Sequence, residues 1–503
     1  MNPFLITDGY KTGHHMMYPQ GTTLVYSNFT PRHGKHTNVR GGRGVVSFGQ
    51  QMVMRQIKEM FDEGFFNKDF TKVLTEIKDE YSLYLNSDYD VSHIGRLHDL
   101  GHLPIKVKAL PEGTFVPYGV PVLTIYNTDP DFFWLTNFLE TLISNMLWMP
   151  MTAATTAHHY KDILTDACIQ TDAQAIDFVD FQGHNFGMRG MAGIDATVYA
   201  GLGHATSFKG DDSLPTIASA RKYYDEKGFV VGSVNATEHS VMCAGGDDSE
   251  LETFRYLMKQ FPTGILSIVS DTWNLWDVLT KYLPVLKDEI LARDGKIVIR
   301  PDSGDPADII CGNNVDSFVS PESPSGKGVI EVLWDLFGGT INEQGYKVLD
   351  PHIGAIYGDS ITPERAKDIT RRLRDKGFAS TNIVLGIGSF TYQYVTRDTH
   401  GFAMKATYVE ILENIDGGDN EGSFISIGRQ IFKDPITSDG SKKSAKGLLS
   451  VDFDKDTEQY KLYDQIPWNI EHLGYLQTIF ENGTFHNQTT LTEIRERINK
   501  INN

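Results

Sequence analysis

Short apolar segments that end in polar loops recur from about Asp177 onward, and this repetition restricts the possible folds of the chain more than any other feature. Each segment has the length of a buried strand, and Gly, Asp or Ser residues follow it. Most are separated by enough residues for a helix and a loop, the pattern of strand–helix units that build a parallel sheet or barrel. The predicted strands are Ile176–Phe181, Val230–Val234, Ile265–Val269, Ile297–Ile299, Ile353–Ile356 and Ile383–Leu385.

The two ends of the chain have a different pattern. The first 150 residues mix short strands such as Val116–Tyr126 with helices, one of which begins at Asp129-Pro130. After about Gly401 a strand-like stretch, Ala403–Leu412, and a helical pattern, Leu491–Ile501, remain. We predict an α/β fold with two units, since 503 residues exceed the usual size of one hydrophobic core. Residues 151–400 form an irregular parallel α/β barrel, and residues 1–150, completed by 401–503, form a mixed α+β domain.

Charge and cysteine content exclude several classes of function. The formal net charge of -19 argues against a nucleic acid or an anionic membrane as partner, because both require a basic surface. Cys168, Cys243 and Cys311 are too few and too far apart for a disulfide framework or a paired metal motif. Residues 1–9 lack the features of a signal peptide, and polar residues interrupt the apolar stretch Phe132–Met149. We therefore expect a cytoplasmic protein.

Several polar residues directly follow predicted strands. Arg300 and Asp302 come after Ile297–Ile299, in a segment that continues through Ser303 and Gly304. A guanidinium can stack on an aromatic ring, and a carboxylate can accept hydrogen bonds from sugar hydroxyls. The same residues also fit a simple strand-end ion pair and turn. In a barrel, residues that follow the strands lie at the end where active sites form.

Other candidates are weaker when taken singly. Gly358 and Gly388-Ser389 could bring backbone N–H groups close to a phosphate, although most such glycines serve turns. His239 lies beside a carboxylate and could act as base, acid or phosphate acceptor, or be structural. Phe186 and Arg189 combine a flat apolar face with a cation, or are a buried ring and a surface charge.

Together these segments resemble the nicotinamide phosphoribosyltransferases of the type II phosphoribosyltransferase family almost from end to end. The collection is more specific than any single motif. The matching stretches are Thr7–Lys11, Gly101–Ile105, Asn127–Pro130, Phe208–Asp212, Glu238–Ser240, Val269–Asp271, Arg300–Gly304 and Phe432–Pro435.

The resemblance implies a pocket for the nicotinamide ring. Phe186 and Arg300 would hold the ring between them, with Tyr10 of the partner subunit closing the pocket. Asp212 would accept a hydrogen bond from the carboxamide nitrogen, and Ser233 would line the pocket. The reaction would convert nicotinamide and phosphoribosyl pyrophosphate to nicotinamide mononucleotide and pyrophosphate.

The resemblance also implies roles around the ribose and the phosphates. His239 would be phosphorylated by ATP, while Asp302 and Asp359 would contact the ribose and Asp271 would lie nearby. Gly358, Asp359, Gly388 and Ser389 would hold the 5′-phosphate and ribose, and Arg32, Arg189, Arg397 and Lys405 would surround pyrophosphate, some across a homodimer interface. Mg²⁺ would arrive on pyrophosphate and not in a cage of protein ligands.

Three departures from the family pattern stand close to these residues. Asn185 occupies a place where Asp is usual, Met188 one where Tyr is common, and Leu385–Phe390 has fewer glycines than its counterpart. Two other readings remain open: a nicotinate phosphoribosyltransferase, which should not favour a carboxylate at position 212, and a non-catalytic binding or signalling protein of the same fold. We find no nucleophile–base pair that would indicate a hydrolase on this barrel.

Overall fold

The computed structural model describes residues 1–37, 39, 42–313, 319–358, 360–414, 424–432 and 445–501. The chain forms two compact units. Unit 1 comprises Met1–Thr152, Arg221–Glu226 and Thr396–Asn503, and unit 2 comprises Ala153–Ala220 and Lys227–Val395. These divisions fall near residues 150 and 400, except that 221–226 belong to unit 1.

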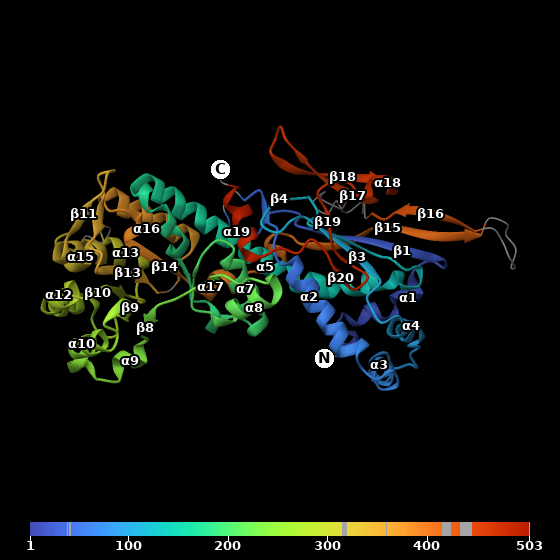
Figure 1. The fold of residues 1–503 in the computed structure, drawn as a ribbon, viewed down its shortest axis with the longest axis horizontal. Helices are drawn as coiled ribbons and strands as arrows, with labels where there is room; N and C mark the ends of the chain where they lie inside the picture. The colour runs from blue at the N-terminus through green and yellow to red at the C-terminus, as the bar shows by residue number, and fades with distance from the viewer. Residues whose placement is uncertain are drawn as a thin grey trace. The chain divides into compact units, whose positions relative to one another are not determined.

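Unit 1 is built on an antiparallel sheet that combines both ends of the chain. Within the described residues it has seven strands in the order β16-β15-β1-β5-β3-β19-β20. Figure 1 shows β15 and β16 beside β1, and Val25 of β1 pairs with Val409 of β15. The expected mixed domain of N- and C-terminal segments is therefore confirmed. The strands are β1 (Thr22–Thr30), β3 (Ile105–Ala109), β5 (Leu123–Asn127), β15 (Ala403–Asn414), β16 (Phe424–Gln430), β19 (Gln477–Glu481) and β20 (Thr484–Phe485).

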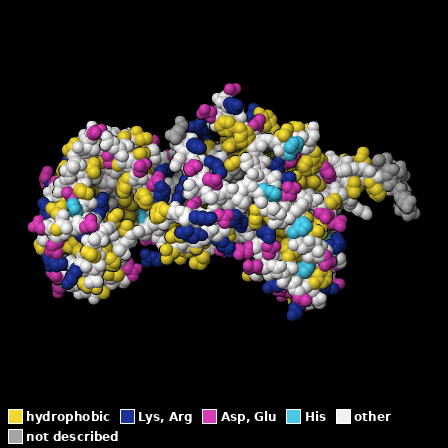
Figure 2. Space-filling model, viewed as in Figure 1, with side chains coloured by type: hydrophobic (Ala, Val, Ile, Leu, Met, Phe, Trp, Pro, Cys, Tyr) yellow, Lys and Arg dark blue, Asp and Glu magenta, His cyan; other side chains and the backbone are white. Residues whose placement is uncertain are grey.

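The predicted helices at both ends of unit 1 are also present. The side chain of Asp129 accepts a hydrogen bond from the backbone N–H of Asp131 in a short 3-10 turn, η4 (Pro130–Phe132). The long helix α5 (Phe133–Thr171) follows at once, and α19 (Leu491–Asn499) ends the chain. None of the described helices is long and apolar enough to cross a membrane. Acidic and basic side chains are interspersed on the face shown in Figure 2.

Unit 2 contains a curled parallel sheet. Its seven described strands have the order β7-β6-β14-β13-β10-β9-β8, and every pairing is parallel. Gly232, just before β8, forms a parallel bridge with Gly210 of β7, which brings the two edges together. This arrangement confirms the irregular α/β barrel. The strands are β6 (Gly183–Asn185), β7 (Gly210–Asp211), β8 (Asn235–Ala236), β9 (Thr263–Val269), β10 (Asp294–Arg300), β13 (Ile353–Tyr357) and β14 (Ile383–Ile387).

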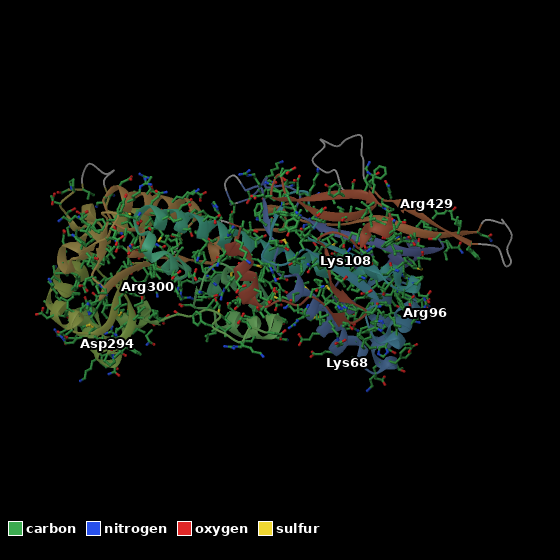
Figure 3. All side chains as sticks on the ribbon, turned by 45° about the horizontal axis from the view of Figure 1, so that its top comes forward. Lys68, Arg96, Lys108, Asp294, Arg300 and Arg429 are labelled. Carbon is green, nitrogen blue, oxygen red and sulfur yellow. The ribbon has the colours of Figure 1, made fainter. Side chains whose placement is uncertain are left out.

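Successive side chains of β10 point alternately toward the hydrophobic core and toward the interior of the barrel. Figure 3 labels Asp294 and Arg300, the first and last residues of this strand. Ile297 and Ile299 are fully buried, whereas Lys296, Val298 and Arg300 line a cavity on the opposite face. Helices cover the outside of the sheet: α13 (Pro306–Cys311), α15 (Val329–Phe337) and α16 (Pro363–Asp375).

Two of the six predicted barrel strands are wrong. The segment Ile176–Phe181 forms a 3-10 turn, η5 (Ala173–Phe178), and the start of helix α6 (Val179–Gln182). Val179 and Gln182 are its buried residues, a helical spacing of three that outweighs the apolar content. Val230–Val234 contributes only the bridge at Gly232, because its neighbour β7 is two residues long and offers no ladder to extend. The other four predicted strands are confirmed.

Candidate active site at the ends of the barrel strands

The functional candidates of unit 2 gather where the parallel strands end. Phe186 follows β6, Asp212 follows β7, Asp271 follows β9, Asp302 follows β10 and Gly358 follows β13. Because all these strands point the same way, their carboxyl ends meet at one end of the barrel. The candidates therefore converge although they are far apart in the sequence.

Phe186 and Arg300 face each other. The Cζ atom of Arg300 lies over the Phe186 ring, 5.3 Å from its centroid. A flat ring held between them needs about 3.5 Å on each side, roughly 7 Å in total, so the guanidinium must move back by roughly 2 Å to admit one. A long hydrogen bond of 3.3 Å, from Nη1 to the carbonyl oxygen of Thr237, and attraction to the Asp212 carboxylate hold the guanidinium. We call Phe186 and Arg300 the ring clamp.

Glycines allow the ring clamp to form. A Cβ atom added at Gly386 would lie 2.9 Å from Cδ2 of Phe186 and 2.6 Å from the carbonyl oxygen of Tyr357. One added at Gly358 would lie 3.1 Å from Nε of Arg300. Gly304, with φ +92°, adopts the left-handed conformation that the turn after Asp302 requires. Gly386 within β14 and Gly358 after β13 thus make room for Phe186 and Arg300.

Asp212 lies beside the ring clamp, and its surroundings favour the ionised carboxylate. His184 Nε2 is 2.8 Å from its Oδ1, and the Ser233 hydroxyl donates a hydrogen bond to the same oxygen. Burial opposes ionisation, but the hydrogen bonds from His184 and Ser233 outweigh it and lower the pKa of Asp212. Among the described residues nothing donates to Oδ2 of Asp212, which leaves that oxygen able to accept from a ligand.

A cavity of about 450 Å³ runs from the ring clamp into the barrel. Its volume lies within the usual range for small-molecule sites. Besides Phe186 and Arg300, it is lined by His184 and Ser233, and by mostly apolar side chains of the inner strand faces. The arrangement is suited to a flat, largely apolar ligand that carries one polar substituent.

His239 lies between two carboxylates at the start of helix α9 (His239–Cys243). Its Nε2 atom is 3.6 Å from Oδ2 of Asp302 and 3.9 Å from Oδ1 of Asp271, and its Nδ1 atom is 3.2 Å from the Thr272 hydroxyl. Oδ2 of Asp271 accepts hydrogen bonds from the backbone N–H groups of Asp302 and Ser303, at 2.9 and 2.8 Å. Asp271 therefore fixes the turn that carries Asp302, while a partly exposed His239 faces solvent.

The phosphate-loop candidates also lie near one another. Gly388 precedes the short helix α17 (Ser389–Gln393), and a Cβ atom added at Gly190 would collide with the Ser389 hydroxyl. The exposed Arg189 is the neighbour of Gly190, so this cation lies next to the Ser389 loop. Asp359 and the stretch 433–435 lie outside the described residues.

Four predicted site residues belong to unit 1. Tyr10 is 64% exposed in the turn η2 (Gly9–Gly13), and its ring contacts His14. Arg32 donates a hydrogen bond from Nε to the carbonyl oxygen of Gly401, at 2.8 Å. Arg397 precedes this position by four residues, and Lys405 follows it by four on β15. Of the four predicted pyrophosphate cations, Arg32, Arg397 and Lys405 therefore belong to unit 1 and Arg189 belongs to unit 2.

Sequence reasoning missed His184 and Asp211. His184 contacts the Phe186 ring at 4.6 Å and holds Asp212. His184 and Phe186 are two residues apart on an extended segment, so their side chains point to the same face. This spacing could have identified His184 as a site residue. Asp211 is 5% exposed on the opposite side of β7 from the cavity, and only the fold distinguishes it from Asp212.

Asp211 should make stability depend on pH. Burial raises its pKa to about 6, so the folded chain favours the protonated carboxyl. Its cost to folding is absent below about pH 4 and grows as pH rises through 6, to on the order of 3 kcal/mol. We expect the free energy of unfolding of wild type, relative to Asp211→Asn, to fall by about 2 kcal/mol between pH 4.5 and 7.5 in urea titrations. Parallel curves for the two proteins would contradict this.

A known protein family and several named relatives match most of this chain. The model of the nicotinate phosphoribosyltransferase (NAPRTase) family matches residues 181–484. A nicotinamide phosphoribosyltransferase of Acinetobacter baylyi is 47% identical, over 99% of this chain and 97% of the relative. One from Mycoplasma pneumoniae is 36% identical, over 81% of this chain and 89% of the relative.

Solved structures show the same fold. Human nicotinic acid phosphoribosyltransferase has a TM-score of 0.55 and 15% identity, over 98% of this chain and 93% of that one. A nicotinate-nucleotide pyrophosphorylase from Pyrococcus furiosus has a TM-score of 0.52 and 16% identity, over 99% and 94%.

Proposed function

Because this chain belongs to the nicotinate phosphoribosyltransferase family, we propose that it transfers phosphoribosyl from phosphoribosyl pyrophosphate to nicotinamide, releasing pyrophosphate, in NAD salvage. It is a phosphoribosyltransferase, and the relatives named for nicotinamide support the amide as acceptor. One observation of the site carries this choice of substrate. The ionised Asp212 beside the ring clamp can accept a hydrogen bond from a carboxamide and repels a carboxylate.

The reaction requires little acid or base catalysis by the pocket. The pyridine nitrogen attacks C1 of the ribose with a free lone pair, so the main task of Phe186 and Arg300 is to orient the ring. Positive charge builds on the sugar as the bond to pyrophosphate breaks. Asp302, held by Asp271, is a carboxylate suited to stabilise that charge.

Charge on the leaving group needs cations. Arg32, Arg189, Arg397 and Lys405 are our candidates for this role. Mg²⁺ commonly binds through substrate phosphates and one or two carboxylates, and the partly exposed Asp302 offers such oxygens. Among the described residues no group of three or more His, Cys, Asp or Glu side chains could hold a metal ion. When bound, Mg²⁺ would offset the charge of pyrophosphate.

ATP would act through His239. The imidazole is partly exposed, and its Nε2 atom lies near two carboxylates that can stabilise positive charge on the ring. A phosphorylated His239 would then lie beside Asp302, next to the expected position of the ribose. ATP hydrolysis would be coupled to turnover at this point.

His239→Ala should abolish the stimulation by ATP and leave a slow ATP-independent reaction, because the phosphate acceptor is lost while the ring clamp stays intact. The measurement is the initial rate with and without ATP for wild type and variant. His352→Ala is a matched control, since His352 also pairs with an aspartate in unit 2 but lies before β13. Equal ATP dependence in His239→Ala and wild type would rule out this role.

We further propose a homodimer with shared active sites. The exposed large side chains Tyr10, Met16 and Met17 lie on the successive elements η2 and α1 (His14–Met17) of unit 1, and they offer apolar surface to a second copy. Light scattering tests the oligomeric state, and Tyr10→Ala should weaken nicotinamide binding if this residue closes the partner's pocket.

The function itself is tested by incubating the purified protein with phosphoribosyl pyrophosphate, Mg²⁺ and either nicotinamide or nicotinate, each with and without ATP. Chromatography then separates the mononucleotides. We expect nicotinamide mononucleotide as the main product. Exclusive formation of nicotinate mononucleotide would establish the alternative substrate, and no product from either pyridine would overturn the proposal.

A further inference from the structure

Asn185 and Asp211 lie opposite each other on neighbouring parallel strands. They are register partners in the pairing of β6 with β7. Asn185 is 3% exposed and Asp211 is 5% exposed, so both side chains are buried. Because side chains alternate along a strand, they point away from the cavity, whereas their neighbours His184, Phe186 and Asp212 belong to the site.

Both side chains of the pair accept hydrogen bonds from residues around them. The Asp211 carboxylate accepts hydrogen bonds from the backbone N–H of Ser213 at 2.5 Å and from the Thr216 hydroxyl at 2.9 Å. The Asn185 side chain lies close enough to offset part of the effect of burial on the pKa of Asp211. The amide group of Asn185 faces Asp211 across the strand pair. Its Oδ1 atom accepts from the backbone N–H of Gly187 at 2.9 Å.

The bonds of Asn185 fix the chain on both sides of Phe186. Asn185 holds Gly187, and Phe186 lies between them with its own N–H bonded to the carbonyl oxygen of Ile387 at 2.9 Å. The backbone N–H of Asp212 donates to the carbonyl oxygen of Asn185 at 3.1 Å. The segment that carries Phe186 and the segment that carries Asp212 are therefore joined through this pair.

We propose that Asp211 is a positioning residue that acts through Asn185 to set the place of Phe186 relative to Asp212, and so determines the affinity for the nicotinamide ring. This inference rests on the proposed function. A buried carboxylate costs folding free energy unless hydrogen bonds or an opposite charge compensate it, and burial raises the pKa of Asp211 in spite of its hydrogen bonds. The family resemblance leads us to expect Asp at position 185. In this chain position 185 is Asn, and the carboxylate of the pair is Asp211 on the neighbouring strand β7.

Exchanging the two side chains tests the proposal. Asn185→Asp places two buried carboxylates opposite each other, and we expect the KM for nicotinamide to rise at least tenfold while the KM for phosphoribosyl pyrophosphate stays within about twofold. Asp211→Asn in the same chain restores one carboxylate and one amide. The double variant should return the nicotinamide KM to within about threefold of wild type.

A matched control separates positioning from general loss of stability. Asp172 is also a buried carboxylate of unit 2 and accepts hydrogen bonds from Asn342 and Thr381. Asp172→Asn should lower the melting temperature without changing the ratio of the two KM values. If Asn185→Asp does not fold, Asp211→Thr, which keeps one acceptor oxygen and loses the other, gives the same readout.

The results that would overturn the positioning role differ from those that would overturn the proposed function. An unchanged nicotinamide KM in Asn185→Asp, a double variant that keeps the defect, or a parallel rise of both KM values would overturn the positioning role. Amide hydrogen exchange at Gly187 provides a second measure that needs no turnover, and we expect at least tenfold faster exchange in Asp211→Thr. Failure of wild type to use nicotinamide would instead overturn the proposed function, and unchanged exchange would overturn only this inference.

Discussion

Asp212→Asn should bring the activities toward nicotinamide and nicotinate much closer together. A substrate carboxylate about 4 Å from the Asp212 charge is repelled by roughly 2 to 4 kcal/mol at effective dielectric constants of about 40 to 20. The lower figure allows for solvent screening of a side chain that is 40% exposed. The ratio of kcat/KM for nicotinamide to that for nicotinate should fall by roughly 30- to 1,000-fold, mainly through improved use of nicotinate.

The hydrogen bonds of Asp212 make this substitution informative. His184 and Ser233 can also bond to an amide oxygen, so Asp212→Asn changes the charge and largely keeps the contacts. Asp335→Asn is the matched control, because it removes an aspartate charge from the outer helix α15 of the same unit. The ratio should not change in that protein. An unchanged ratio in Asp212→Asn would show that something else selects the amide.

Arg300→Ala should produce the second large effect. Stacking of a cation on an aromatic ring in a desolvated site contributes about 2 kcal/mol, which corresponds to roughly a 30-fold loss in kcat/KM for nicotinamide. Arg300→Lys should recover only part of this loss, since an ammonium group lacks the planar face of a guanidinium. Steady-state kinetics with nicotinamide as the varied substrate measures both variants.

A surface arginine provides the comparison. Arg255 pairs with Glu252 and Glu289 on the outside of unit 2, and Arg255→Ala should leave the kinetics unchanged. Wild-type kinetics in Arg300→Lys would argue against ring stacking, because a point charge would then suffice. An effect confined to the KM for phosphoribosyl pyrophosphate would reassign Arg300 to the phosphate side of the site.

Much of the barrel could be predicted from the sequence because its central strands are long and apolar. β9, β10, β13 and β14 were all expected, and so were the polar residues at their ends. The start of the helix that follows Gly304 also has a local explanation, the pair Asp305-Pro306. The Asp305 side chain accepts from the backbone N–H groups of Ala307 and Asp308 and starts α13.

The edges of the same sheet could not be predicted. β7 and β8 have two residues each and β6 has three, which is too short to show an alternating pattern. Their hydrogen bonds come from residues far away in the chain, such as the contact between Gly210 and Gly232. The apolar segment Ile176–Phe181 before β6 was wrongly predicted as a strand, because it forms a 3-10 turn and the start of a helix in which only Val179 is buried.

The sequence by itself determined which chemical groups follow each long strand, because strand length, turn residues and helix starts are set by neighbours along the chain. Only the tertiary structure decided which side of the sheet each group faces at the short strands. Asp211 and Asp212 are adjacent and chemically identical, yet one is buried against Thr216 and the other points toward the ring clamp. That difference follows from the pairing of β7 with β6, since a shift of one residue in register would exchange the two faces.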